Sequence, residues 1–261
     1  MAENTVSFSY ITNTGLVREH NEDNVGFLGK SLPEEHGSMF RAVTEEVPLS
    51  ACAAAGVFDG MGGEAAGEAA SCAAAAAFAA FPFEQGTGEE LVLAFTAMEE
   101  AVASMAKERR ISLTGTTAVT VLTKGRHASI GHLGDSPAFL CRNGKLSLLT
   151  KPHTDAELME KLGIRTGGKG RLTRFVGMST SLLVPEPELG SVDIRPGDRL
   201  LLCSDGLSDL LLREELAEVL AAISAPGRAA EELFLRAMER GGKDNITVLL
   251  VQYPDEMTGE P

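Results

Sequence analysis

The chain has 261 residues, with 23 Lys and Arg against 37 Asp and Glu, and a formal net charge of −14 at pH 7. Hydrophobic residues make up 44% and charged residues 23%, a composition typical of a globular protein and not of a disordered one. Nucleic acids and anionic membranes are bound by clustered Lys and Arg, so this acidic balance argues against both as partners.

The first half of the chain predicts short strands followed by two helices. Apolar alternation predicts the strands, and an apolar run ending at Asp59 predicts another. An Ala-rich stretch and a stretch with apolar residues three and four apart predict the helices. The expected strands are 5–12, 24–29, 39–43 (within a hairpin over 31–50) and 51–58, and the expected helices are 65–80 and 88–109.

The second half predicts more strands and three further helices. Four adjacent strands, separated by turn signals such as Asn143-Gly144, indicate an antiparallel meander. These strands are 116–123, 127–133, 137–142 and 145–150. Next we expect a short helix at 155–162, a mobile glycine-rich loop at 163–171 and strands at 188–194 and 199–204. After these come helices at 213–223 and 227–240 and a strand at 246–253. This order predicts an α+β layered sandwich in a single domain, 1–261, with a core over 5–253 and a frayed tail over 254–261.

Chain-wide signals favour a cytoplasmic protein. The start, Met1-Ala2-Glu3-Asn4, lacks the basic and apolar regions of a signal peptide. The longest apolar run, residues 72–83, is shorter than the about 20 residues that cross a bilayer. The four cysteines contain no CxxC pair, so we expect reduced core thiols rather than a zinc ribbon.

Several carboxylates stand where predicted strands end or begin. Asp59, Asp135 and Asp205 each follow an apolar run and adjoin a glycine, whereas Asp244 and the pair Glu22-Asp23 precede strands. A single Asp-Gly at a strand end is usually only a turn, but its recurrence favours a shared site. Converging carboxylates repel one another unless hard cations such as Mg²⁺ or Mn²⁺ bind them, and two such ions form the usual clamp for phosphate-ester hydrolysis.

Two further features have competing interpretations. Arg18 lies four residues before Glu22 and could bind phosphate through its guanidinium fork, although taken alone it is a typical surface charge. The segment 60–65 fits the dinucleotide fingerprint G-x-G-x-x-A of an oxidoreductase. We disfavour that class because Asp59 would place a negative charge beside the pyrophosphate, and no strand ending in an acid follows about 20 residues later.

Seven blocks, in their order along the chain, resemble those of the metal-dependent serine/threonine protein phosphatases of the PP2C (PPM) family, in the bacterial form. They lie within residues 5–253, and each is short, but their combination in order is specific. The blocks are residues 15–23 (GLVREHNED), 57–63 (VFDGMGG), 114–118 (TGTTA), 134–136 (GDS), 172–174 (LTR), 203–207 (CSDGL) and 243–247 (KDNIT).

The resemblance implies a four-layer α/β/β/α sandwich with two central antiparallel sheets and two Mn²⁺ or Mg²⁺ ions. It implies that Asp59 bridges both ions and that the Gly60 carbonyl, Asp205 and Asp244 complete the first site. It further implies that Glu22 contacts the second ion through water and that Asp23 supports the cluster. Asp135 with Asp205 would form a weaker third metal site, and Arg18 would bind the phosphate. Asp59, Asp205 and Arg18 are then the catalytic residues.

The resemblance also implies direct attack of a metal-bridging water on phosphoserine and phosphothreonine esters. The implied partners are phosphorylated proteins made by a Ser/Thr kinase, and we expect a monomer that binds neither nucleic acid nor membrane. The alternative is a catalytically weak phosphoprotein-binding regulatory module on the same fold, which the complete carboxylate set argues against.

The chain departs from the family pattern at four places. Pro137 stands where the family usually has Arg, Pro152 where it usually has Asp, and Met61 where some relatives have His. The segment after His153 is shortened. None of these changes removes an implied primary ligand, so we expect activity with altered substrate choice or third-metal affinity.

Overall fold

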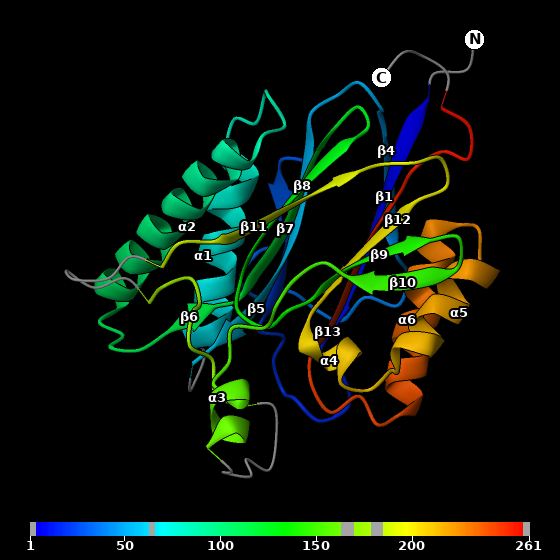
Figure 1. The fold of residues 1–261 in the computed structure, drawn as a ribbon. Coiled ribbons are helices and arrows are strands. Elements are labelled where there is room, and N and C mark those ends of the chain that lie inside the picture. The colour runs from blue at the N-terminus through cyan, green and yellow to red at the C-terminus, as the bar shows by residue number, and fades with distance from the viewer. Residues whose placement is uncertain (1–3, 63–65, 163–169, 179–184, 258–261) are drawn as a thin grey trace.

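The computed structural model describes residues 4–62, 66–162, 170–178 and 185–257 (Figure 1). Most of the predicted glycine-rich loop (163–169) and the end of the predicted frayed tail (258–261) lie outside these residues. No helix in the described ranges is long and apolar enough to cross a membrane.

Two antiparallel sheets lie at the centre of the molecule. The first contains, in order, β10 (Lys145–Leu148), β9 (Ala138–Arg142), β12 (Arg199–Cys203), β13 (Ile246–Gln252), β1 (Thr5–Asn13) and β4 (Val43–Pro48). The second contains β11 (Glu188–Asp193), β8 (His127–Leu133), β7 (Ala118–Lys124), β5 (Ala53–Met61), β2 (Asp23–Phe27) and β3 (Lys30–Ser31), with β6 (Gly115–Thr116) paired to β5. Strands β1 and β12 both pair antiparallel with β13, and β2 and β7 both pair antiparallel with β5.

Helices cover the outer faces of both sheets, which confirms the predicted four-layer sandwich. Figure 1 shows α1 (Ala66–Ala80) and α2 (Gly88–Arg109) beside the second sheet, and α5 (Arg213–Ala222) and α6 (Pro226–Glu239) beside the first. Two short helices lie in connections between strands: α3 (Ala156–Lys161) between β10 and β11, and α4 (Asp205–Ser208) directly after β12. Small side chains such as Ala70 and Ala74 let α1 pack closely on the sheet around Phe58.

Apolar side chains fill three layers between these elements. One cluster lies between the two sheets and includes Phe8, Phe27 and Val57. The other two lie under the helix pairs, with Phe234 in the α5–α6 layer and Phe95 in the α1–α2 layer. Close packing of this buried apolar surface holds the two sheets in a fixed relative position. The strand ends of one sheet therefore keep fixed positions relative to those of the other.

The predicted four-stranded meander is wrong, because its strands belong to different sheets. Strands β7 and β8 pair in the second sheet, whereas β9 and β10 pair in the first, where β9 adjoins β12. The connection over 134–137 therefore crosses from one sheet to the other, and Gly134 turns there with φ 113°. A turn signal marks a change of direction but does not say which sheet the next strand joins.

The strand predicted at 39–43 is also displaced, since β4 begins at Val43. Backbone groups before it bond elsewhere: the Asn13 side chain donates to the Met39 carbonyl, and the Ala42 N–H donates to Glu231. Phe40 is 71% exposed, so the apolar residues that suggested a strand do not form a buried face.

All four cysteines are free thiols, but the expectation that they are core residues holds only for two. Cys141 and Cys203 are buried, and Cys52 and Cys72 are partly exposed. Cys52 lies just before β5 at the margin of the layer that contains Phe58, and Cys72 lies on α1.

Candidate metal centre

Strand ends from both sheets bring the predicted carboxylates together. Asp59 lies near the end of β5 in the second sheet, where it pairs in register with Asp23. Asp205 follows β12 and Asp244 precedes β13, both in the first sheet, and Asp135 lies in the crossover between the sheets. All of these carboxylates except Asp23 line a pocket of about 180 Å³. Its other lining residues are Arg18, Glu22, Gly60, Met61, Thr117, Leu172 and Asn245.

Two glycines allow the backbone segments around this pocket to approach closely. A Cβ at Gly60 would lie 2.2 Å from the Gly67 carbonyl oxygen and 2.6 Å from that of Glu22. A Cβ at Gly206 would lie 2.0 Å from the carbonyl oxygen of Asn245. Any larger residue at these positions would separate the carboxylates, so the glycines after Asp59 and Asp205 determine the geometry of the site.

Asn245 holds three loop segments together, a role that the sequence reasoning missed. Its side-chain amide donates to the carbonyls of Thr14 and His20 at 3.0 and 2.9 Å, and its Oδ1 accepts the Glu22 N–H at 2.8 Å. This residue fixes Glu22 opposite Asp244. The only signal in the sequence was its place directly after Asp244 in a matched block.

Asp23 is buried behind the pocket and does not line it. Its Oδ2 accepts hydrogen bonds from the hydroxyls of Ser204 at 2.7 Å and Thr247 at 2.6 Å. Its Oδ1 is buried without a hydrogen-bond partner. Burial raises the pKa of Asp23 to about 7, although the two hydroxyls partly counteract this effect. The structure places Asp23 behind the pocket, and the support of the cluster that the family resemblance implies for it remains a prediction.

Asp59 experiences the strongest electrostatic repulsion. Burial raises its pKa well above the usual value, and the negative charges of Asp23, Asp205, Asp135 and Asp244 raise it further. Oxygen ligands gathered in this way suit a hard divalent cation, which would offset their repulsion and which prefers such ligands. The donor set, the close backbone approach and the unpaired Asp23 oxygen therefore fit the predicted metal ions.

Arg18 is the basic residue among those lining the described pocket. Its Nη2 donates to Asp244 Oδ2 at 2.8 Å, and this hydrogen bond is the main reason why the pKa of Arg18 is raised. Both side chains are partly exposed, so the ion pair adds little to stability. The guanidinium thus stands at the edge of the pocket, where an incoming phosphate would compete with Asp244 for it.

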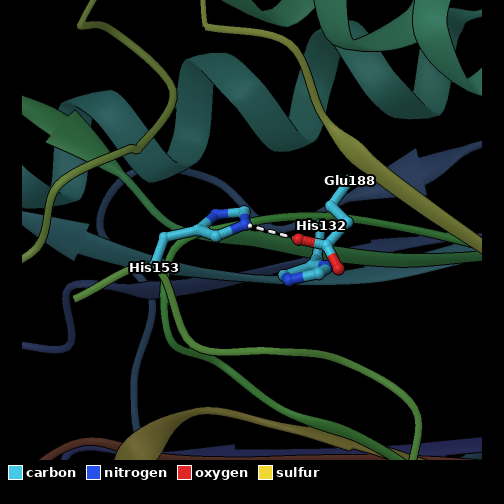
Figure 2. Close-up of side chains that lie close together, drawn as sticks. All are labelled: His132, His153 and Glu188. Carbon is cyan, nitrogen blue, oxygen red and sulfur yellow. Dashed lines mark hydrogen bonds and ion pairs between the residues drawn. The ribbon is translucent and has the colours of Figure 1, made fainter. Parts of the chain in front are cut away.

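Two histidines and a glutamate form a second cluster near the pocket (Figure 2). The rings of His132 and His153 stack with centroids 4.6 Å apart, and His153 Nε2 lies 3.2 Å from Glu188 Oε2. His153 Nδ1 accepts the Gly134 N–H, so the proton of the neutral ring is on Nε2 and is donated to Glu188. His132 Nε2 donates to the Lys151 carbonyl.

This hydrogen bonding decides between a metal site and a structural role for the cluster. Burial lowers the pKa of both His132 and His153, which keeps the rings neutral. Both ring nitrogens of His153 and the Nε2 atom of His132 are thus already engaged in hydrogen bonds. The cluster is therefore a hydrogen-bonded support next to the Gly134 turn.

Comparisons with known proteins agree with this geometry. A family model described as protein phosphatase 2C matches residues 43–246. The chain is 32% identical to the serine/threonine protein phosphatase PstP of Mycobacterium tuberculosis, over all of this chain but only 48% of that protein, so it spans about half the length of this relative. It is 30% identical to the serine/threonine phosphatase stp of Listeria monocytogenes, over 92% of this chain and 93% of the relative. A crystal structure of the PstP catalytic domain with two manganese ions matches with a TM-score of 0.75 and 31% identity, covering 96% of this chain and 100% of that one.

Proposed function

This chain belongs to the protein phosphatase 2C family, and from that premise we propose that it hydrolyses phosphoserine and phosphothreonine esters of proteins. The convergence of Asp59, Asp205 and Asp244 from two sheets on one pocket, with Arg18 at its edge, carries the proposal. These groups match a reaction that requires cation binding and phosphate binding at adjoining positions.

We propose that two Mn²⁺ or Mg²⁺ ions occupy the pocket. Asp59, the Gly60 carbonyl, Asp205 and Asp244 would hold the first ion, and Glu22 would reach the second through water. Asp135 with Asp205 would form a weaker third site. When bound, such ions lower the pKa of water and offset the charge that develops on the phosphoryl oxygens.

The chain's own residues fix this arrangement before a substrate binds. Ser204 and Thr247 hold Asp23 by hydrogen bonds to its Oδ2 atom, so the orientation of this carboxylate is fixed. Thr117 accepts the Asp59 N–H at 3.2 Å and shares a hydrogen bond with Ser136 beside the crossover. A preorganised site loses little energy to rearrangement in the transition state.

The partners that we propose are phosphorylated proteins produced by a Ser/Thr kinase. The net charge of −14 disfavours strongly acidic partners and favours phosphosites in basic segments. We further propose that the chain acts as a cytoplasmic monomer.

We expect Mn²⁺-dependent hydrolysis of both p-nitrophenyl phosphate and a phosphothreonine peptide. The assay compares initial rates with Mn²⁺, with Mg²⁺ and with excess EDTA, followed by restoration with Mn²⁺. Rates that remain at background in Mn²⁺ while the peptide still binds would instead support a phosphoprotein-binding module.

Replacing Arg18 by Ala should raise KM for the phosphopeptide more than it lowers kcat, if the guanidinium binds the phosphate alike in ground and transition states. A loss of about 2 kcal/mol of charge-assisted hydrogen bonding corresponds to a roughly 30-fold change in kcat/KM. Steady-state kinetics at saturating Mn²⁺ measure both constants. Arg228→Ala is the control, because that arginine is also exposed and ion-paired but lies on α6. An unchanged KM would contradict the role of Arg18.

A further inference from the structure

We propose that a groove beside the metal pocket binds an apolar side chain of the substrate, close in sequence to its phosphorylated residue. The inference rests on the proposed phosphatase function and specifies which protein substrates the site would select. The groove is defined by five floor residues, Pro137, Phe139, Leu148, Leu211 and Leu216, and has a volume of about 670 Å³.

The groove adjoins the metal pocket at a shared lining residue. Asp135 lines both cavities, since it lies in the crossover between the sheets. A polypeptide whose phosphate occupies the metal pocket therefore has the entrance of the groove next to it. The volume of the groove falls within the range of sites that enclose several side chains or a small ligand.

The floor is apolar and preformed. Phe139, Leu211 and Leu216 are almost fully buried members of the layer under α5 and α6, so their positions are fixed by packing. Leu148, on the neighbouring strand β10, is partly buried against the same layer and pairs with Phe139 in register. Leu148 keeps part of its side chain accessible above this fixed layer, and covering it with an apolar side chain of the substrate gains free energy by excluding water.

Three basic side chains stand among the groove's lining residues, beside the carboxylates of Asp135, Glu188 and Asp209. Lys151, Arg174 and Arg213 line the groove, and the guanidinium of Arg213 lies 6.0 Å from the centre of the Phe139 ring. In a chain with a net charge of −14, cations at this position offset the repulsion that an anionic phosphopeptide would otherwise meet.

His153 fixes the groove relative to the metal pocket. Its backbone N–H donates to the Gly134 carbonyl at 2.9 Å, and its ring accepts the Gly134 N–H at 3.1 Å, directly before Asp135. Its carbonyl accepts the Thr173 N–H at 2.8 Å, and its ring also binds Glu188. The turn at Gly134, the segment at Thr173 and strand β11 are therefore held together, so the distance between phosphate site and groove is set by the fold.

The test compares phosphothreonine peptides that carry a single Leu or Ala at each of the four positions on either side of the phosphorylated residue. Initial rates give the ratio of kcat/KM for the Leu peptide to that for its Ala counterpart, measured separately within each protein. We expect one position at which Leu is preferred about tenfold, as burial of most of a leucine side chain implies. p-Nitrophenyl phosphate, which is too small to reach the groove, is assayed in parallel.

Leu148→Glu should reduce the preferred Leu/Ala ratio to about one, because it places a charge in the floor of the groove. Leu146→Glu is the matched control: this leucine also lies on β10 and packs against the same layer, but it does not line the groove, so the ratio should persist. A milder Leu148→Gln variant, whose fold is checked by circular dichroism, covers the event that Leu148→Glu fails to fold.

Three results would overturn the inference. In the first, the wild type hydrolyses p-nitrophenyl phosphate but shows no Leu preference at any peptide position. In the second, a folded Leu148 variant keeps the Leu preference. In the third, Leu146→Glu loses the Leu preference as fully as the Leu148 variant does. Absence of p-nitrophenyl phosphate hydrolysis would instead overturn the proposed phosphatase function, and with it this inference.

Discussion

Asp59→Asn should lower kcat/KM for p-nitrophenyl phosphate by roughly 10³-fold or more. The substitution preserves the shape of the side chain but removes the central carboxylate of the pocket, and cation contributions of several kcal/mol correspond to such a factor. Isothermal titration calorimetry should show weakened Mn²⁺ binding in the same variant. The measurement of binding separates loss of the ion from loss of the reaction.

The same substitution should stabilise the protein when EDTA is present. Asp59 is surrounded by other buried or partly buried carboxylates, which raise its pKa, and removing one charge from this group relieves repulsion. The expected gain is on the order of 1 kcal/mol or more, because each unit by which folding raises a carboxyl pKa costs about 1.4 kcal/mol once the group is ionised. Urea unfolding at pH 8 measures it.

Asp193→Asn serves as the control, because Asp193 also ends a strand but is fully exposed. It should change neither turnover nor stability. Asp205→Ala should share the loss of activity with Asp59→Asn, since both residues line the pocket. Full activity in either pocket variant would contradict the assignment of these residues as ligands.

The metal-free protein should lose stability as the pH rises from about 4 to 7. Asp23 has its pKa raised from 3.8 to about 7 in the folded state, so in this range the folded state binds more protons than the unfolded state. Stability then decreases with increasing pH, and the contribution of Asp23 levels off above pH 7, while the raised pKa of Asp59 adds a decrease of the same sign. A shift of this size corresponds to a loss on the order of 4 kcal/mol.

Thermal unfolding in EDTA across this range, with and without added Mn²⁺, measures the effect. The gain in Tm from Mn²⁺ should be larger at pH 8 than at pH 5, because the cation offsets charges that appear only at the higher pH. The lowered pKa values of His132 and His153 act in the opposite direction near pH 6.5. Asp23→Asn isolates the carboxylate, since it should flatten the decrease; an unchanged slope in this variant would contradict the assignment.

Local patterns were sufficient to predict most elements and the positions of the carboxylates. An apolar run that ends in Asp-Gly places Asp59 and Asp205 at strand ends, because the glycine can occupy a crowded turn. The second helix has the predicted bounds 88–109 because its apolar spacing and its capping residues agree.

What the sequence could not predict depends on contacts between distant segments. The pattern of 116–150 does not encode that β9 joins β12 rather than β8, because buried strands of either sheet are equally apolar. Likewise, nothing near Asn245 indicates its bonds to Thr14 and His20, more than 200 residues earlier. Arg18 pairs with Asp244 across a similar separation, which only the closed fold brings about.

The central place of β13 has a consequence for how the molecule folds. This strand lies between β1 and β12, so the first sheet cannot close until residues 246–252 have inserted. Asp244 reaches the pocket only by that insertion, whereas Asp59 and Asp23 can already pair in the other sheet. A folding intermediate without β13 would therefore carry an incomplete ion site, and high-affinity cation uptake would follow, not precede, the slow pairing of distant strands.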